Sequence, residues 1–344
     1  MTAMRISANV ITLSRIVLLP LPCALFYWGD LTAQWIAFAL YIALGATDVI
    51  DGKVARKYGV TRLGTFLDPL ADRIFVLSMM IAFTARGAFP WWAFALVFFR
   101  EFLLTALQSA ASHHHIATAV TPLGRLKTLF QMGAMATIFW TLVLPKLWMV
   151  LLCAAVGGVF IALWAILRLK GPPPFHLLPC GLGFLSVAVA SIIFDQHTAL
   201  LLQALVVVAM TWASAIAYIY IGTKNYRPRG VDVFDISRIV WSIAYAVFVL
   251  PLVGFFPQAF LALLVAISLG LAFGFLDNFA AEEHKRIHSG WFWASSTLAV
   301  LLGAAALATY FGGAQASVSA LCWIFAALNA ALTTCVAKMV FSRR

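Results

Sequence analysis

The sequence predicts an all-α protein that crosses a membrane many times. Apolar residues make up 64% of the 344 residues and charged residues only 10%, so too little polar surface remains to cover a water-soluble core. Apolar runs of about 20 residues, long enough to cross roughly 30 Å of hydrocarbon as helices, recur along the chain. An isolated strand could not satisfy its backbone hydrogen bonds in lipid, which leaves helices as the spanning elements.

The apolar runs predict about twelve spans, with about six on each side of a proline-rich segment. That segment, Arg168–Pro174, contains three consecutive prolines, which cannot continue a helix. We therefore divide the chain into a transmembrane domain at residues 1–171 and a second transmembrane domain at residues 172–344. The predicted spans are 9–28, 33–50, 67–85, 89–111, 127–145, 147–168, 177–195, 198–221, 236–256, 258–276, 291–311 and 316–340.

The basic residues predict the orientation of these spans. With a cytoplasmic N-terminus, the cytoplasmic loops hold most of the lysines and arginines, whereas the opposite loops hold only Arg86 and Lys146. Both termini are therefore expected to face the cytoplasm. The net charge of +11 fits this bias and an attraction to anionic lipid head groups. Because the basic residues are scattered over short loops, we expect no binding to nucleic acid.

Four aspartates form the main candidate site, in a chain with only twelve acidic residues. Asp48 and Asp51, spaced i, i+3, share a helix face at the cytoplasmic end of the second predicted span. Asp68 and Asp72, spaced i, i+4, share a face at the start of the third. If the two helices lie side by side, the carboxylates repel each other unless one or two divalent cations such as Mg²⁺ or Mn²⁺ compensate them. The alternative is that they pair only with neighbouring arginines.

The segment around these aspartates resembles the signature of the CDP-alcohol phosphotransferase (CDP-alcohol phosphatidyltransferase) family. Its spacer of seven residues before the second glycine is one residue shorter than the usual one. The resemblance covers roughly residues 5–170 and implies a six-helix core, followed here by about six further transmembrane helices. The matching pattern is Asp48-x2-Asp51-Gly52-x2-Ala55-Arg56-x7-Gly64-x3-Asp68-x3-Asp72.

The resemblance implies transfer of a phosphatidyl group from CDP-diacylglycerol to a hydroxyl, with release of CMP, as in phospholipid biosynthesis. By resemblance, Asp48, Asp51, Asp68 and Asp72 hold two divalent cations, Mg²⁺ or Mn²⁺. Asp72 also acts as the general base that removes the proton of the acceptor hydroxyl. The residues to which the resemblance assigns CDP binding are Asp48, Gly52, Ala55, Arg56 and Gly64.

Three further segments resemble phosphatidylglycerophosphate synthases within this family: NVITLSRI at 9–16, REFLLTAL at 100–107 and GRLKTLFQM at 124–132. They favour sn-glycerol 3-phosphate as the acceptor, and phosphatidylglycerol phosphate as the product. A cardiolipin synthase that uses phosphatidylglycerol and a phosphatidylinositol-phosphate-type synthase are the alternatives within the family. The candidate acceptor-binding residues are Arg15, Arg100, Arg125 and Lys127.

Each of these assignments has a plainer alternative. Arg100 and Glu101 could simply neutralise each other within the fourth span, and Arg125 and Lys127 could be ordinary positive-inside residues. Arg73 stands where glycerophosphate enzymes more often have lysine, which weighs against that branch of the family.

A twelve-helix transporter is the alternative of a different class. It would need ionisable groups near the bilayer midplane in both halves, whereas the acidic residues of the second half lie at the ends of its spans. We expect the second half to support or regulate the first. The resemblance suggests a homodimer packed through the first six helices, a surface that the second half could also cover. We expect an integral protein of a bacterial inner membrane, with its active site facing the cytoplasm.

Two groups of histidines could suggest metal sites. His113, His114 and His115 form a run in a predicted cytoplasmic loop, and His284 and His288 have the i, i+4 spacing of a shared helix face. We favour solvated segments for both groups. The five cysteines include no CxxC pair and are expected to be buried free thiols.

Overall fold

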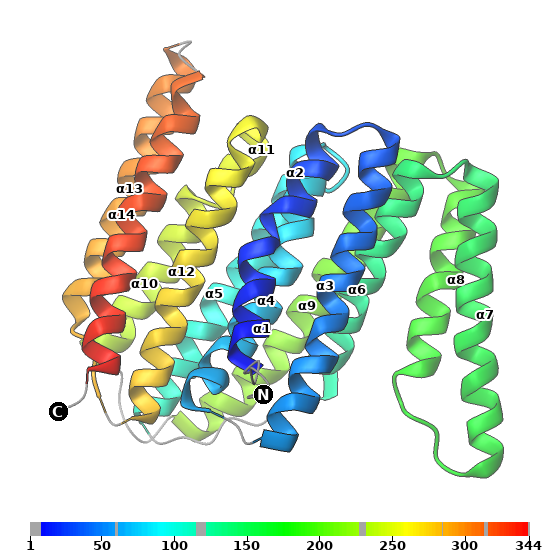
Figure 1. The fold of residues 1–344 in the computed structure, drawn as a ribbon, viewed down its shortest axis with the longest axis horizontal. Coiled ribbons are helices and arrows are strands. Elements are labelled where there is room, and N and C mark those ends of the chain that lie inside the picture. Colours follow the sequence, from blue (N-terminus) through cyan, green and yellow to red (C-terminus); the bar gives the residue numbers. More distant parts are fainter. Residues whose placement is uncertain are drawn as a thin grey trace, which may run out of the picture.

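The computed structural model is a bundle of long helices that lie side by side (Figure 1). It describes residues 8–58, 61–114, 122–226, 232–283, 285–312 and 316–342, and within these ranges all regular elements are helical. The predicted all-α fold class is confirmed. The elements are α1 (Ala8–Leu18), α2 (Pro20–Trp28), α3 (Leu31–Tyr58), α4 (Arg62–Ala85), α5 (Trp91–His113), α6 (Pro122–Val143), α7 (Lys146–Lys170), α8 (Leu177–Ile193), α9 (Gln196–Tyr226), α10 (Val233–Phe248), α11 (Leu252–Phe255), the 3₁₀ turn η1 (Pro257–Ala259), α12 (Phe260–Glu282), α13 (Ser289–Phe311) and α14 (Ala316–Phe341).

The predicted spans correspond to these helices. Within the described ranges, nine helical segments are long and apolar enough to cross a membrane, and α1 with α2, and α10 with α11, each form one of them. The helices α3 and α4, with 28 and 24 residues, also have the length to cross but carry the aspartates. The apolar α8 is shorter, with 17 residues. The chain is therefore an integral membrane protein.

Local sequence signals explain where several helices begin. The side chain of Thr61 accepts a hydrogen bond from the backbone N–H of Gly64 and caps α4. Asp232 and Asp235 form a reciprocal capping box at the start of α10. The start of α1, the start of α4 and the end of α14 lie at the same end of the bundle (Figure 1), as the distribution of basic residues predicts.

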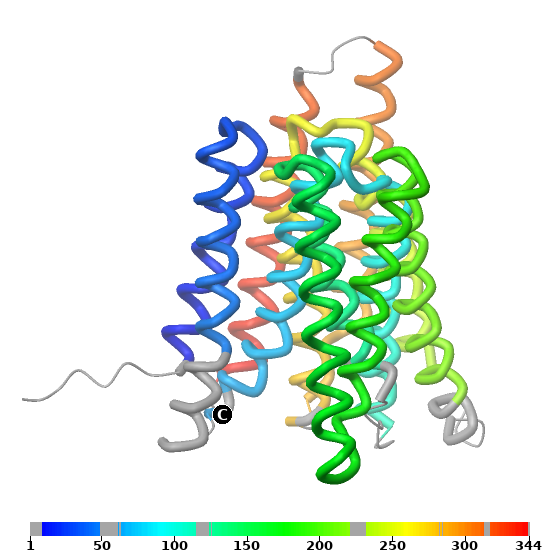
Figure 2. Tube along the Cα trace, turned by 90° about the vertical axis from the view of Figure 1, so that its right-hand side faces the viewer, coloured from blue at the N-terminus to red at the C-terminus, as the bar shows by residue number. Residues whose placement is uncertain are grey.

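The two predicted halves share one core, and α5 lies at its centre. Helix α5 packs against α4 of the first half and against α9, α10 and α12 of the second. The ring of Phe102 in α5 lies 5.2 Å from that of Trp241 and 4.8 Å from that of Tyr245, both in α10. Figure 2 shows α1 to α3 on one face of the bundle and α9 on the opposite face.

The predicted boundary at residues 171/172 falls between α7 and α8. These two helices pack mainly against each other and form a hairpin at the edge of the bundle (Figure 1). The division of the chain there stays a prediction. Because α9, α10 and α12 cover α5 and α6, much of the first half's surface is buried within the chain itself. The homodimer likewise stays a prediction.

Candidate active site

Three of the four aspartates meet around the N-terminal helix. Arg15 of α1 donates from Nη1 to Oδ1 of Asp48 in α3 at 2.7 Å, and its Nη2 lies 3.7 Å from Oδ1 of Asp72 in α4. Thr12 of α1 donates to Oδ1 of Asp68 at 3.3 Å. The side chain of Asp51 lies outside the described residues, although its backbone belongs to α3.

Helix α1 packs against both α3 and α4. The helices α3 and α4 also contact each other, because Tyr41 of α3 donates to the carbonyl of Phe75 in α4 at 2.8 Å and stacks on its ring at 4.1 Å. The two aspartate-bearing helices thus contact each other through Tyr41 and Phe75, while α1 packs against both and brings Arg15 to their aspartates. The guanidinium of Arg15 is buried, at 2% exposure, and its charge offsets part of the repulsion between Asp48 and Asp72. The structure places Arg15 among the aspartates, and its predicted role in binding the acceptor stays a prediction.

The aspartate cluster has the chemistry of a site for hard divalent cations. The side chains of Asp48 and Asp72 are 50% and 62% exposed, so their carboxylate oxygens are accessible from outside the bundle. Such oxygens are the ligands that Mg²⁺ and Mn²⁺ prefer. Within the described part of the chain, no three His, Cys, Asp or Glu side chains already form a compact metal-binding group. The donor set fits a divalent cation, and the metal-ligand assignment stays a prediction.

Gly64 is the one predicted CDP-binding glycine whose surroundings the structure describes. A Cβ atom at this position would lie 3.1 Å from Oδ1 of Asn9 and 3.1 Å from Oγ1 of Thr61. These two side chains are hydrogen-bonded to each other at 2.8 Å. Gly64 therefore lets α1 approach the start of α4, which is a structural reason for glycine. The side chains of Ala55 and Arg56 lie outside the described residues, as do the surroundings of Gly52.

A second charged cluster lies deeper in the bundle, around Glu101 of α5. Its carboxylate is contacted by Nε of Arg73 at 3.3 Å, Nη1 of Arg100 at 2.9 Å and Nζ of Lys127 at 2.5 Å. These residues come from α4, α5 and α6. Arg100 and Glu101 do pair, as the plainer interpretation supposed, but one carboxylate faces three cations. The cluster therefore keeps an excess of positive charge.

A cavity of about 240 Å³ between α4, α5 and α6 is lined by Asp72 of the aspartate cluster and by the charged residues around Glu101. Its charged lining consists of Asp72, Arg73, Arg100, Glu101 and Lys127, three cations against two carboxylates. Thr128 and Gln131 add polar groups to the wall. The geometry thus places an exposed carboxylate and a set of cations on one cavity. Of the predicted acceptor residues, Arg100 and Lys127 line it, and the side chain of Arg125 lies outside the described residues.

Arg73 and Glu101 belong to this cavity, although neither was predicted as a site residue. A signal for Glu101 was present, because it is the only acidic residue in the apolar run from Trp91 to His113. A buried acid in such a run requires a cationic partner. Arg73 directly follows Asp72 in the sequence. This position alone does not predict toward which helices the Arg73 side chain points.

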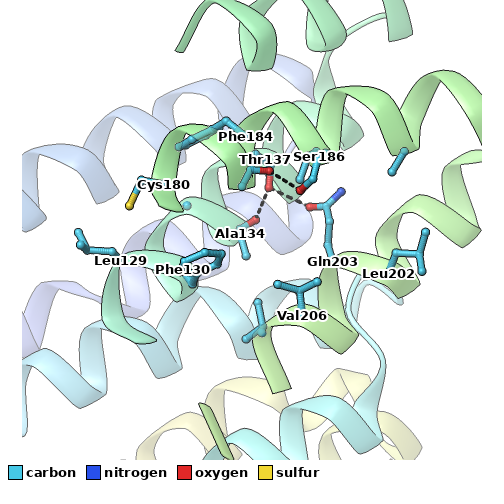
Figure 3. Close-up of a pocket in the computed structure, with 15 residues that line it drawn as sticks. Leu129, Phe130, Ala134, Thr137, Cys180, Phe184, Ser186, Leu202, Gln203 and Val206 are labelled. Carbon is cyan, nitrogen blue, oxygen red and sulfur yellow. Dashed lines mark hydrogen bonds between the residues drawn. The ribbon is translucent and has the colours of Figure 1, made fainter. Parts of the chain in front are cut away.

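Another pocket, of about 210 Å³, lies between α6, α8 and α9 (Figure 3). Its lining is mainly apolar and includes Phe130, Phe184 and Val206. The main polar contact is a hydrogen bond from Thr137 to Oε1 of Gln203 at 2.8 Å. The pocket has no charged lining residue and shares none with the charged cavity. It does not suit a phosphorylated substrate.

The histidine interpretations are corrected by the structure. Nε2 of His113 lies 3.3 Å from Oδ1 of Asp277 in α12, and Nε2 of His114 lies 3.0 Å from Oδ2 of Asp235 in α10. Both rings therefore pack against the second half instead of forming a solvated loop. His115 and His284 lie outside the described residues. Lys285–His288 lies between α12 and α13, so the expected helix face with His288 does not form, and Nδ1 of His288 accepts the N–H of Gly290 at 3.1 Å.

The predicted family is confirmed by comparison with known proteins. The family model for CDP-alcohol phosphatidyltransferase matches residues 5–164, which include α1 to α6 and most of α7. A CDP-diacylglycerol--glycerol-3-phosphate 3-phosphatidyltransferase from Salmonella typhimurium is 31% identical over 170 residues, 46% of this chain and 90% of the relative. The chain belongs to the CDP-alcohol phosphatidyltransferase family.

Other members of this family match over shorter segments. A probable phosphatidylglycerophosphate synthase from Mycobacterium tuberculosis (strain H37Rv) is 38% identical over 128 residues, which is 36% of this chain and 61% of the relative. A CDP-diacylglycerol--glycerol-3-phosphate 3-phosphatidyltransferase from Rickettsia prowazekii is 32% identical over 129 residues, 37% of this chain and 71% of the relative. No solved structure shows significant similarity to the chain. Helices α8 to α14 lie outside the match to the CDP-alcohol phosphatidyltransferase family model.

Proposed function

We propose that this protein transfers a phosphatidyl group from CDP-diacylglycerol to sn-glycerol 3-phosphate, giving phosphatidylglycerol phosphate and CMP. Family membership supports the reaction class. One observation supports the choice of acceptor: the cavity lined by Asp72 is also lined by Arg73, Arg100 and Lys127. A carboxylate that can accept a proton therefore lies beside cations that can bind a phosphate, and sn-glycerol 3-phosphate carries both a hydroxyl and a phosphate.

In the proposed reaction, Arg100 and Lys127 bind the phosphate of the acceptor. This directs the acceptor hydroxyl toward Asp72, which removes its proton as the oxygen attacks the β-phosphorus of CDP-diacylglycerol. The new P–O bond forms while the bond to CMP breaks, and CMP leaves with the electron pair. Two divalent cations, Mg²⁺ or Mn²⁺, held by Asp48, Asp51, Asp68 and Asp72, would neutralise the charge that grows on the leaving phosphate.

The nucleotide would lie along α3. Gly52 and Ala55 would leave room for the cytidine, and Arg56 would contact the diphosphate. The aspartates lie near one end of the bundle, so the lipid tails of the donor can stay in the bilayer while its head group reaches the cluster. We place this end at the cytoplasmic face, because the loops at this end carry most of the basic residues. We place the protein in a bacterial inner membrane, because the relatives that it resembles come from bacteria.

Release of CMP tests the proposed function. Purified protein would receive CDP-diacylglycerol, Mg²⁺ or Mn²⁺, and sn-glycerol 3-phosphate, phosphatidylglycerol or inositol phosphate in separate reactions. We expect release with sn-glycerol 3-phosphate, lost on addition of EDTA and restored by excess metal. Release with phosphatidylglycerol alone would assign the chain to the cardiolipin synthase branch, and release with inositol phosphate alone to the third branch. Release that persists with EDTA would contradict the metal site.

Replacing Lys127 with methionine should weaken acceptor binding. Lys127 is buried and lines the cavity, and a hydrogen bond to a charged group contributes about 1.5–3 kcal/mol. We expect the KM for sn-glycerol 3-phosphate to rise on the order of 10–100-fold, while the KM for CDP-diacylglycerol stays within about twofold. Steady-state kinetics of CMP release measures both constants. Lys146→Met, at the start of α7, is the matched control, and an equal rise of KM in both variants would refute the role of Lys127.

A further inference from the structure

Helix α9, outside the part of the chain that matches the family, contacts a cation of the charged cavity. Nη2 of Arg100 donates to Oγ of Ser214 at 2.9 Å, and both residues are buried. Ser214 donates its own proton to the carbonyl of Thr211 at 2.7 Å. Its Oγ therefore presents a lone pair to Arg100 and acts purely as an acceptor in this contact. The guanidinium is held between Glu101 on one nitrogen and Ser214 on the other.

The same helix reaches another lining residue and is anchored beside it. Oγ1 of Thr211 accepts a hydrogen bond from Nε2 of Gln131 at 3.3 Å. The indole of Trp212 donates to the carbonyl of Leu96 in α5 at 3.2 Å, and its ring packs at 5.7 Å from that of Phe99. Helix α9 is thus fixed against α5 and α6 at the depth of the cavity, and its polar groups face the cavity wall.

Helix α12 contacts a second cation of the cavity. The guanidinium carbon of Arg73 lies 4.5 Å from the ring centroid of Phe275, a cation–π contact. Arg73 also donates to the hydroxyl of Thr105 and, at 3.2 Å, to the carbonyl of Glu101. The neighbouring Gly274 permits this approach, because a Cβ atom there would lie 2.8 Å from Cγ2 of Thr105. The Phe275 ring of α12 therefore covers one face of the Arg73 guanidinium.

We propose that α9 and α12 complete the acceptor site, with Ser214 positioning Arg100 and Phe275 positioning Arg73. This inference rests on the proposed function, since it assigns the second half of the chain to the same cavity. Arginine side chains are long and lose rotamer freedom when they bind an anion. Holding them in place before binding lowers that entropic cost and so strengthens binding of the acceptor phosphate. The second half is then part of the site and not a separate enzyme.

Two substitutions test these positioning residues. Ser214→Ala and Phe275→Leu should each raise the KM for sn-glycerol 3-phosphate about 3–10-fold, with kcat and the KM for CDP-diacylglycerol within about twofold. Ser214→Thr and Phe275→Tyr, which keep the hydroxyl and the ring, should stay near wild type. Matched controls in the second half are Ser242→Ala, a buried serine bonded only within α10, and Phe273→Leu, a buried phenylalanine of α12. Neither control lines the cavity.

The changes in acceptor KM and in kcat show whether Ser214 and Phe275 have the proposed positioning roles. An unchanged acceptor KM in both Ser214→Ala and Phe275→Leu would overturn the inference. A fall in kcat with no selective change of the acceptor KM would also overturn it, because that is the result of a merely structural role. If wild type releases CMP only with phosphatidylglycerol, the proposed acceptor is wrong, and the same variants are compared by their KM for phosphatidylglycerol, whose phosphodiester is also anionic.

A binding measurement keeps the inference testable without turnover. Inorganic phosphate should raise the thermal unfolding temperature of the wild type and of both controls, and raise it less in Ser214→Ala and Phe275→Leu at equal concentration. Equal stabilisation of all five proteins would overturn the positioning roles. No stabilisation of the wild type at any phosphate concentration would overturn the cavity as an anion site, whatever the result of the CMP assay.

Discussion

Asp72→Asn should lower the rate of CMP release by about a thousandfold or more. Asparagine has nearly the same shape but cannot accept the proton of the acceptor hydroxyl, and general-base catalysis contributes about 10²–10⁴-fold. Asp72 lines the charged cavity and is 62% exposed, so the substitution should leave the fold intact. CMP release at saturating substrates measures the effect, and an unchanged thermal unfolding temperature verifies folding.

The matched control is Asp195→Asn, in the short connection between α8 and α9. The Asp195 carboxylate accepts hydrogen bonds from the N–H and the hydroxyl of Thr198 at the start of α9 and is exposed. We expect wild-type activity from this variant. If Asp72→Asn kept more than about a tenth of the wild-type rate, which is far outside the range of a lost general base, Asp72 would not be the base.

Arg238→Met should be the most destabilising single substitution between the two halves. Arg238 of α10 is 2% exposed and pairs with Asp277 of α12 at 2.5 Å and with Asp235 at 3.2 Å. Without the guanidinium, two buried carboxylates lose their main counter-charge, which costs about 3–5 kcal/mol. Because His113, the last residue of α5, and His114, which follows it, bind the same two aspartates, the loss should loosen α5 from α10 and α12. Thermal unfolding in detergent micelles measures the loss.

Arg286→Met is the control for this prediction. Arg286 is 56% exposed and lies 3.8 Å from Asp232, so its removal should cost less than about 1 kcal/mol. Adding Asp277→Asn to Arg238→Met should restore part of the stability, because it removes one of the carboxylates left without the guanidinium. Equal unfolding temperatures for the two arginine variants would show that the buried cluster does not hold the halves together.

The sequence alone determined the features that depend on near neighbours in the chain. Helices of membrane length follow from apolar runs, and the spacing of Asp68 and Asp72 puts them on one face of one helix whatever that helix contacts. The common side of the termini and the aspartates followed from where the basic residues fall. The sequence also predicted the family correctly, because the family signature lies within one short segment.

Only the tertiary structure decided which helices face each other. It packed α1 against both α3 and α4, so that Arg15 lies among the aspartates, and it brought Arg73, Glu101 and Lys127 together from three helices. It also packed α9 against Arg100 and α12 against Arg73. His113, which was expected in a solvated loop, instead contacts Asp277. Such contacts depend on the order and rotation of helices in the bundle, which side-chain packing fixes. In a chain apolar on nearly every face, hydrophobic periodicity does not contain that information.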